Sequence, residues 1–196
     1  MSPLLLCRGV ERKLTYTPEN YREAPFIKYT NTMIPNIREV KPTDAKAIAD
    51  IYNYYIVNTT VTYELEPVTE KEMAQRIEEI STRYPYFVFE QEGQVIAYCY
   101  AHPWRTRAAY QHTLETTIYL RHDVKHRGIG SVMVKHLIEL CRQQGYHALI
   151  ACATDENEES RIFHEHLGFK HVAHYSEVGW KFGRWIGIND FELILR

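Results

Sequence analysis

The stretch that most constrains the fold covers residues 125–141 and reads KHRGIGSVMVKHLIELC. It follows a β-prone segment at residues 113–120, and apolar residues recur at helical spacing after Gly130. Gly128 and Gly130 therefore stand at a strand-to-helix junction, where the first N–H groups of a helix are unpaired and the helix dipole is positive. Because glycine lets an anion approach the backbone closely, the junction suits a tight turn and a pyrophosphate site about equally.

The residues after this junction divide into two helical faces. The polar face carries Lys135, Glu139 and Arg142, and Gly145 ends the helix. The apolar face carries Val132, Met133, Leu137, Ile138 and Cys141.

Two common phosphate-binding loops are absent from the sequence. A Walker loop requires G-x-x-x-x-G-K-[ST], and a dinucleotide fingerprint requires G-x-G-x-x-G. The cationic side chains of Lys125 and Arg127 nevertheless stand beside the glycines, so a phosphate site of another type stays open.

The remaining sequence alternates between strand and helix patterns. Thr43 is the expected N-cap of the first helix, and Thr69 with Glu72 forms a capping box for the second. The order β-α-α-β-β-β-α-β-α-β-β predicts one α/β domain with a mixed sheet. The predicted elements are a strand at 36–40, helices at 42–58 and 69–81, a hairpin at 86–101 turning at Gly93, a strand at 113–120, the helix after Gly130, a strand at 146–154, a helix at 156–169 ending near Gly168, and two strands joined around Gly183.

Length and charge limit the classes of protein. The 196 residues suit one domain at 33–196, preceded by a polar extension at 1–32. With 23 Lys and Arg against 25 Asp and Glu, the net charge of −2 argues against a nucleic-acid partner. No apolar run approaches the ~20 residues of a membrane span. We therefore expect a cytoplasmic protein without a membrane partner.

The four cysteines, Cys7, Cys99, Cys141 and Cys152, form no CxxC pair. The last three lie in apolar segments, so we interpret them as buried free thiols of a reducing compartment. A nucleophilic cysteine is not expected.

Several stretches resemble one known family. Residues 125–130 resemble the Q/R-x-x-G-x-G/A loop of the GNAT N-acetyltransferases, with Lys125 where the pattern has Gln or Arg. From Ile37 onward, the sequence is similar in order and spacing to the branch that acetylates phosphinothricin, methionine sulfoximine and methionine sulfone. The stretches that carry this resemblance are IYNYYIVNTTVTYELEPVT, HPWRTRAAYQHTLETTIYL, RIFHEHLGF and VGWKFGRW.

The resemblance implies the GNAT (acyl-CoA N-acyltransferase) fold, a central mixed, mostly antiparallel sheet flanked by helices. It also implies acetyl-CoA as cosubstrate and a homodimer. In the family, the glycine loop holds the pyrophosphate, and the preceding strand is splayed so that its backbone pairs with pantetheine. The residues that this resemblance assigns to the cofactor are Ile118, Tyr119, Leu120, Lys125, His126, Arg127, Gly128, Ile129, Gly130 and Asn157.

Acetyl transfer to an amine requires removal of a proton from the ammonium and polarisation of the thioester. A lone Glu in a strand usually faces outward, but the resemblance assigns Glu115, within T-x-E-x-T-x-Y, as the general base. A lone His on a helix is more often structural. The resemblance instead favours a role for His164 near the cofactor sulfur or the substrate, where many acetyltransferases have Tyr.

A small substrate with an oxyanionic group needs oriented cationic donors, and Arg binds such groups through a planar fork. Arg105 and Arg107, with Tyr110, precede the catalytic strand and are the candidates, the alternative being a solvated loop. Tyr63 is a candidate aromatic contact.

The ten histidines form no set with metal-site spacing, so no metal is predicted. Two alternatives to the amino-acid-like substrate stay open: another amine, such as a protein N-terminus, and a non-catalytic acyl-CoA-binding module.

Overall fold

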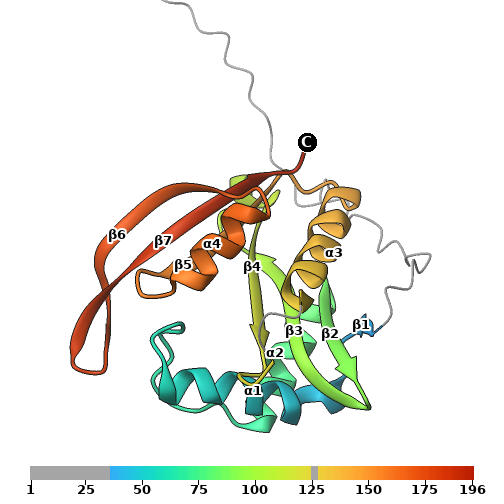
Figure 1. The fold of residues 1–196 in the computed structure, drawn as a ribbon. Helices are drawn as coiled ribbons and strands as arrows, with labels where there is room; N and C mark the ends of the chain where they lie inside the picture. Colours follow the sequence, from blue (N-terminus) through green and yellow to red (C-terminus); the bar gives the residue numbers. More distant parts are fainter. Residues whose placement is uncertain (1–35, 125–127) are drawn as a thin grey trace, which may run out of the picture.

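The computed structural model describes residues 36–124 and 128–196. The predictions for residues 1–32, Lys125, His126 and Arg127 lie outside the described residues. The element order agrees with the one predicted from the sequence (Figure 1). In chain order the elements are β1 (Ile37–Glu39), a 3-10 turn (Pro42–Asp44), α1 (Ala45–Asn58), α2 (Glu70–Ser81), β2 (Tyr86–Gln91), β3 (Gln94–Pro103), a second 3-10 turn (Ala108–Tyr110), β4 (Thr113–Leu120), α3 (Ile129–Gln143), β5 (Ala148–Thr154), α4 (Glu158–His166), β6 (Lys170–Lys181) and β7 (Arg184–Ile194).

The described strands form one seven-stranded sheet in the order β1-β2-β3-β4-β5-β7-β6. The pair β4–β5 is parallel, and every other neighbouring pair is antiparallel. This arrangement confirms the predicted mixed, mostly antiparallel sheet. The hairpin of β6 and β7 extends from one side of the sheet, away from β1 (Figure 1).

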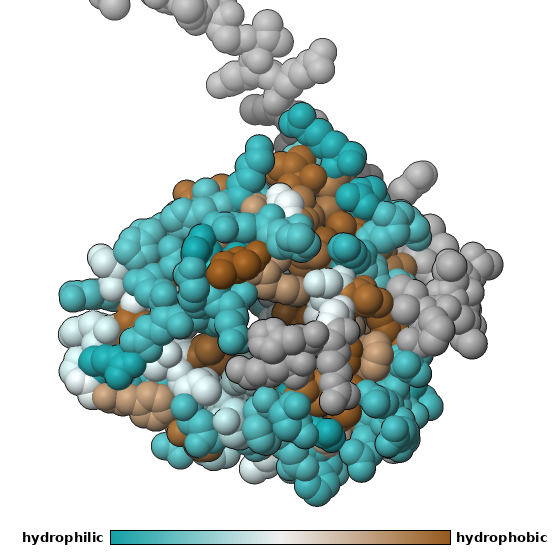
Figure 2. All heavy atoms as spheres, viewed as in Figure 1, coloured by the Kyte–Doolittle hydropathy of each residue, from teal (hydrophilic) through white to brown (hydrophobic). Residues whose placement is uncertain are grey.

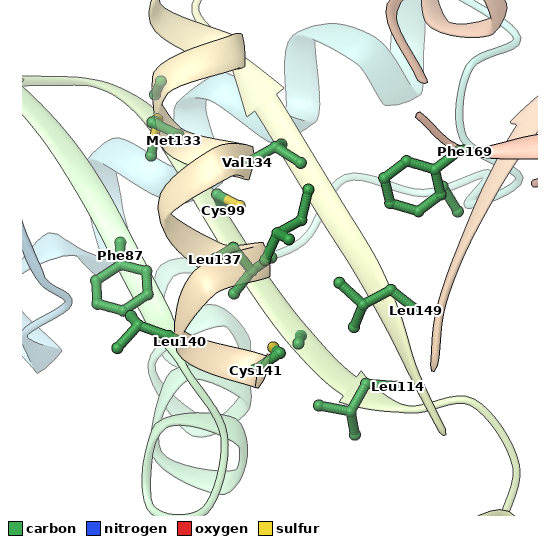
Figure 3. Packing of buried hydrophobic residues seen from close by; sticks show 14 of the residues in the cluster. Phe87, Cys99, Leu114, Met133, Val134, Leu137, Leu140, Cys141, Leu149 and Phe169 are labelled. Atoms are coloured by element: carbon green, nitrogen blue, oxygen red, sulfur yellow. The ribbon is translucent and has the colours of Figure 1, made fainter. Parts of the chain in front are cut away.

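Helices cover both faces of this sheet, and strand alternation supplies an apolar side chain to each face. Phe87 belongs to the core cluster under α3, whereas its neighbour Val88 belongs to the cluster under α1 and α2. Leu137 of α3 and Ile48 of α1 are both fully buried. Figure 3 shows α3 packed onto β3 and β4, and the labelled residues of this core are Phe87, Cys99, Leu114, Met133, Val134, Leu137, Leu140, Cys141, Leu149 and Phe169.

The first helix begins later than predicted. Thr43 is not its N-cap, because residues 42–44 form a 3-10 turn and Asp44 occupies the cap position. The Asp44 carboxylate accepts hydrogen bonds from the Lys41 backbone N–H at 2.7 Å and from Arg38 at 2.8 and 2.9 Å. A carboxylate with these three donors holds the turn, so Thr43 is not needed as a cap.

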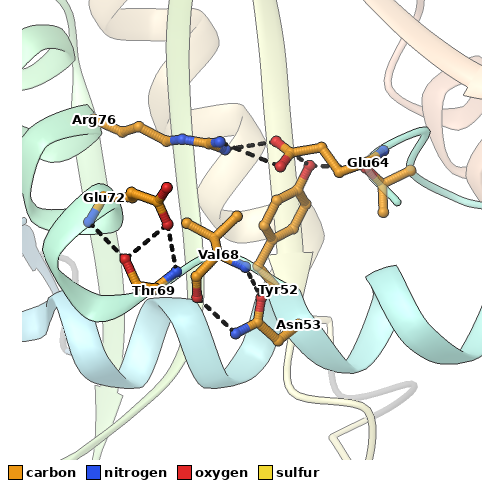
Figure 4. A network of polar contacts seen from close by, with 8 residues as sticks. Tyr52, Asn53, Glu64, Val68, Thr69, Glu72 and Arg76 are labelled. Atoms are coloured by element: carbon orange, nitrogen blue, oxygen red, sulfur yellow. Dashed lines mark hydrogen bonds and ion pairs between the residues drawn. The ribbon is translucent and has the colours of Figure 1, made fainter. Parts of the chain in front are cut away.

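Two other local predictions have opposite outcomes. The capping box of α2 is confirmed: Glu72 N–H donates to Thr69 Oγ1 at 3.2 Å, and Thr69 N–H donates to Glu72 Oε2 at 2.8 Å (Figure 4). Val132, however, is 39% exposed and does not belong to the apolar face of α3. The buried face of α3 instead includes Val134 and Leu140. The rest of the protein covers a wider part of the helix surface than the predicted apolar face.

Candidate active site

The parallel strands β4 and β5 pair only at one end. Their register runs from Thr113–Ala148 to Thr116–Ala151 and, within the described chain, goes no further. The rest of β4, residues 117–120, stays paired with β3, while residues 152–154 of β5 pair with β7. The edge of β4 that faces β5 is therefore open from Thr117 to Leu120.

A cavity of about 1110 Å³ lies at this separation, between the two strands and the helices α1, α3 and α4. The face in Figure 2 is mostly hydrophilic and is hollowed near its centre. No Lys or Arg occurs among the described residues that line the cavity. Its lining includes Tyr52, Tyr54, Tyr55, Tyr63, Tyr100, His102, Glu115, Ile118, Tyr119, Leu120, His122, Gly128, Ile129, Gly130, Ser131, Cys152, Asn157, Glu159 and His164.

Glu115 lies in β4 just before the strands separate, opposite Ile150 of β5 and His102 of β3. Its side chain is 31% exposed and borders the cavity. Burial raises the pKa of the Glu115 carboxyl, the nearby His102 lowers it, and Asp190 raises it. A carboxylate that is held less acidic than usual, at the wall of a cavity, is suited to accept a proton.

The N-terminus of α3 lies at another side of the cavity. Gly128 is its N-cap and has a φ of 72°, a left-handed conformation that glycine adopts without steric cost. A Cβ on Gly130 would lie 3.3 Å from Phe163 Cε2, so this residue keeps the first turn of α3 close to α4. With Ile129 and Ser131, these residues present unpaired N–H groups of a helix start to the cavity.

The open end of β4 packs against aromatic side chains of α1. The ring of Tyr119 lies 5.0 Å from that of Tyr52 and 5.2 Å from that of Tyr55, measured between centroids. The Tyr55 hydroxyl donates to the Leu120 carbonyl at 2.6 Å. Ile118 also lines the cavity, and its Cδ1 would lie 3.6 Å from a Cβ on Gly130. The three residues predicted at this strand end therefore all border the cavity.

Asn157 and His164 both belong to α4 and its cap. The Asn157 side chain accepts a hydrogen bond from the Ser160 N–H at 3.1 Å, so it is the N-cap of the helix, and it also lines the cavity. His164 is buried, with its ring stacked 6.0 Å from that of Phe191.

The proton of neutral His164 is placed by its neighbours. Nδ1 lies 2.8 Å from the Ser160 carbonyl oxygen, and a carbonyl only accepts, so Nδ1 carries the hydrogen. Nε2 of the neutral ring is then an acceptor. Burial lowers the pKa of His164, and the bond to Ser160 raises it. His164 borders the cavity as a neutral, packed ring, and its chemical role stays a prediction.

Tyr63 is held against the hairpin of β6 and β7. Its hydroxyl donates to the carbonyls of Ile186 and Gly187 at 2.9 and 3.0 Å. Two further contacts join the same hairpin to the segment before Tyr63: Lys181 donates to the Thr62 carbonyl at 2.8 Å, and Glu156 accepts from both Arg184 and Thr60. These contacts fix one wall of the cavity.

A polar network joins α1, α2 and the segment between these two helices. The Tyr52 hydroxyl lies 2.7 Å from Thr62 Oγ1 and donates to Glu64 at 3.2 Å, and Arg76 donates to Glu64 at 2.6 and 3.2 Å (Figure 4). Arg76 is thus a cation near the cavity that a carboxylate of the protein itself already engages.

Arg105, Arg107 and Tyr110 do not lie among the residues that line the cavity. Both Arg residues are exposed, and the Arg105 guanidinium lies 4.3 Å from the centroid of the Trp104 ring. The Tyr110 ring packs edge-on against Trp104 at 5.3 Å. The structure therefore shows a surface cluster around Trp104, and a substrate role for these residues stays a prediction.

The interpretation of Cys152 as a buried core residue is wrong. Cys99 and Cys141 are buried as predicted, but Cys152 is exposed toward the cavity rather than a core residue. Desolvation by the cavity walls, with Asp190 and Glu115 nearby, raises the pKa of the Cys152 thiol to about 12. The thiol is therefore protonated at neutral pH and is a poor nucleophile.

Several cavity residues were missed by the sequence analysis. Tyr52, Tyr55 and Tyr100 fit ordinary core patterns, so their position at the cavity has no separate sequence signal. His102 directly follows the predicted hairpin at 86–101, and the register of β3 and β4 places it opposite Glu115. Among the described residues, no group of three His, Cys, Asp or Glu could hold a metal ion, and no helix is long and apolar enough to cross a membrane.

Three features of this cavity are those of an acyl-CoA-dependent transferase site. They are the parallel strand pair that separates around the cavity, the helix that begins at a glycine beside it, and the carboxylate where the strands separate. A family model described as an acetyltransferase (GNAT) domain matches residues 37–189. The chain belongs to the GNAT family of N-acetyltransferases, which use acetyl-CoA as cosubstrate.

Several of the similar proteins are named for the acetylation of phosphinothricin or methionine sulfoximine. The chain is 36% identical over 161 residues to phosphinothricin N-acetyltransferase of Streptomyces viridochromogenes, which covers 80% of this chain and 88% of that protein. It is 33% identical to the L-methionine sulfoximine/L-methionine sulfone acetyltransferase of Pseudomonas aeruginosa, over 83% of this chain and 96% of that protein. A phosphinothricin acetyltransferase structure from Sinorhizobium meliloti in complex with acetyl-CoA superposes with a TM-score of 0.79 at 33% identity, over 83% and 89% of the two chains.

Proposed function

We propose that this protein transfers an acetyl group from acetyl-CoA to the amino group of a small amino-acid-like substrate, of the phosphinothricin, methionine sulfoximine or methionine sulfone type. The observation that carries the proposal is the position of Glu115 at the point where β4 and β5 separate, inside a cavity that also reaches the start of α3. The names of the relatives support this substrate class.

The cavity fits acetyl-CoA. The open edge of β4 offers the backbone groups of Ile118 and the N–H of Leu120 to an amide-containing chain such as pantetheine, because alternate residues of β4 face away from β3. Tyr119 pairs with β3 through its backbone and borders the cavity with its side chain. Gly128, Ile129 and Gly130 offer the N–H groups of a helix start to phosphate, and a side chain at Gly130 would crowd Phe163 there. Asn157 retains its amide N–H₂ as a donor, because its oxygen caps α4. Lys125, His126 and Arg127 complete the proposed cofactor set.

When bound, acetyl-CoA supplies an activated acetyl group as a thioester. Glu115 takes the proton from the substrate ammonium, directly or through a water molecule, and leaves a neutral nucleophilic amine. Its raised pKa makes the carboxylate a stronger base than an exposed Glu. The protonated thiol of Cys152 favours direct transfer to the amine over an acetylated enzyme.

Recognition of an oxyanionic group on the substrate is assigned to residues at the rim and outside the described cavity lining. The described cavity lining carries no Lys or Arg, and its histidines include His102, His122, His164 and His166. We retain Arg105, Arg107, Tyr110 and Tyr63 as the proposed substrate contacts. A rise in the substrate KM of Arg107→Ala would support the Arg cluster, and an unchanged KM would remove it.

A thiol-release assay with acetyl-CoA tests the function. Phosphinothricin, methionine sulfoximine, methionine sulfone and ordinary amino acids are compared as acceptors, with Glu115→Gln as the base variant. Glu79→Gln is the matched control, because Glu79 lies on the exposed face of α2 away from the cavity. We expect saturable release that Glu115→Gln loses and Glu79→Gln keeps.

Two other results would redirect the proposal. Release with a different amine alone would replace the substrate class and keep the base. Binding of acetyl-CoA without release on any amine, including a peptide with a free N-terminus, would favour the non-catalytic acyl-CoA-binding module.

We also propose that the protein is a cytoplasmic homodimer. The support is an apolar surface at the end of the β6–β7 hairpin, where the paired rings of Trp180 and Trp185 are 53% and 57% exposed and Phe182 is 54% exposed. Apolar surface of this kind commonly marks an interface between chains. Sedimentation velocity tests the proposal, because a monomer at micromolar concentration would contradict it.

A further inference from the structure

His102 and Glu115 face each other across the β3–β4 pair. They are direct register partners, and His102 Nε2 lies 3.9 Å from Glu115 Oε1. Their side chains are 32% and 31% exposed, and both residues line the cavity. The proposed function assigns the proton of the substrate ammonium to Glu115 but leaves open how that proton reaches solvent.

The orientation of the His102 ring bears on this question. Its Nδ1 lies 3.1 Å from the Pro103 carbonyl oxygen, which can only accept a hydrogen bond. Nδ1 therefore carries the hydrogen of the neutral ring, and Nε2, the nitrogen on the side of Glu115, has a free lone pair. This ring can take a proton from the Glu115 carboxyl group and cannot donate one to it while neutral.

We propose that His102 is a positioning residue for acetyl transfer, which accepts at Nε2 the proton that Glu115 has taken from the substrate amine and delivers it to solvent. The proposal rests on the proposed function. The N–H bond of the ammonium breaks as an O–H bond forms on Glu115. That O–H bond then breaks as an N–H bond forms at Nε2, and the imidazolium releases the proton to solvent.

The distance and exposure suit this transfer. A separation of 3.9 Å exceeds a hydrogen bond, so the proton crosses through one bridging water or after a small rotation of the His102 side chain. The partial exposure of His102 gives the second step a route to water.

Three other groups lie around Glu115, and their effect on its ionisation differs from that of His102. These groups are Tyr100 of β3, Cys152 of β5 and Asp190 of β7. Burial and Asp190 both disfavour the ionised Glu115, whereas the protonated form of His102 favours it by its charge. Loss of His102 therefore removes the proton acceptor and also makes the carboxylate harder to regenerate.

The test uses His102→Gln and His102→Gly in the thiol-release assay with the best acceptor amine. His112→Gln is the matched control, since His112 lies exposed in the loop before β4 and does not line the cavity. We expect each His102 variant to lose about tenfold or more in kcat/KM near neutral pH, and its acidic limb to move to higher pH. Added imidazole should restore much of the activity of His102→Gly and none of that of Glu115→Gln.

Some outcomes would overturn the proposal without touching the proposed function. They are a pH profile of His102→Gln that superposes on the wild type, or no imidazole rescue of a folded, acetyl-CoA-binding His102→Gly. A second measurement needs no turnover: the Glu115 carboxyl resonance is titrated by ¹³C NMR in the free protein and in His102→Gln. The pKa of Glu115 should rise in the variant, and an unchanged titration would contradict the proposal. If no amine is acetylated, the proposed function fails, and the NMR titration still decides whether the two groups are coupled.

Discussion

The ring of Tyr63 lies directly against the backbone of Gly179, and a Cβ added to Gly179 would be 2.5 Å from Cε1 and Cζ of that ring. Such a distance is well inside van der Waals contact. The Tyr63 ring can therefore pack against the hairpin of β6 and β7 because residue 179 is a glycine. The Tyr63 hydroxyl reaches the Ile186 and Gly187 carbonyls only from this position. One glycine of the hairpin thereby sets one wall of the cavity.

Gly179→Ala should displace Tyr63 and weaken this wall. Overpacking of this kind costs about 1–3 kcal/mol of unfolding free energy. We expect a lower denaturation midpoint and a higher KM for the amine. Adding Tyr63→Ala should make the effects strongly non-additive, because the methyl group then has space. Additive losses in the double variant would show that the strain lies elsewhere.

Glu115→Gln should separate activity from stability. The folded-state pKa of Glu115 is raised by burial, so the protonated form is the one that folding favours. Its contribution to stability is thus present at low pH and is lost as pH rises through the raised pKa. Gln mimics the protonated form, so the variant should unfold at a higher temperature than wild type at pH 7 to 8. Near pH 4 the difference should vanish.

The activity of the same variant should move the opposite way. Wild-type kcat/KM should fall as pH drops through the raised pKa of Glu115, because the base becomes protonated. Glu115→Gln should lose about 100-fold or more at neutral pH. Calorimetry and thiol release on one preparation test both statements. A variant with lower stability and wild-type turnover would refute the assignment of Glu115 as a desolvated base.

Gly128→Ala isolates the backbone requirement at the start of α3. A Cβ there would meet no described residue within 4 Å, so the expected cost comes from the φ of 72°. For an L-residue this conformation costs about 1–2 kcal/mol. Gly128→Asn should cost less, because Asn enters the left-handed region more readily. Chemical denaturation of the two variants measures the difference, and equal losses would point to a contact instead of a backbone cause.

The sequence predicted the order of elements and their approximate bounds because glycines and apolar periodicity are local signals. Thr113–Leu120 was predicted with its observed bounds, and the Thr69–Glu72 box was recognised from spacing alone. The prediction of Thr43 as the N-cap was wrong, because the Asp44 carboxylate, which Arg38 binds, holds the first turn instead. That choice depends on the side chain of Arg38, which belongs to the preceding strand.

The candidate site was predicted less completely, and the reason is three-dimensional. Glu115, Gly128 and Gly130 lie in recognisable motifs, whereas Cys152 lies in an apolar run that is typical of a buried strand. It reaches the cavity because β5 leaves β4 after Ala151, an event without a local sequence mark. His102 is positioned by the register of β3 and β4, so one residue alone does not reveal its role.

His164 offers the last test, because packing and chemistry make different predictions for it. Its ring is buried among Phe163, Phe169 and Phe191, so His164→Ala should cost about 2–4 kcal/mol and leave a cavity. His164→Phe keeps an aromatic ring of similar size and loses only the nitrogens.

If His164 acts at the sulfur or the substrate, His164→Phe should keep most of the stability and lose about tenfold or more in kcat. Because burial lowers the pKa of His164, this loss should be similar across pH 7 to 9, where the neutral ring prevails. Turnover and acetyl-CoA KM of His164→Phe equal to wild type would make the ring a packing element. Ser160→Ala tests the orientation separately, since it removes the hydroxyl 3.2 Å from Nδ1 and keeps the carbonyl that holds the ring.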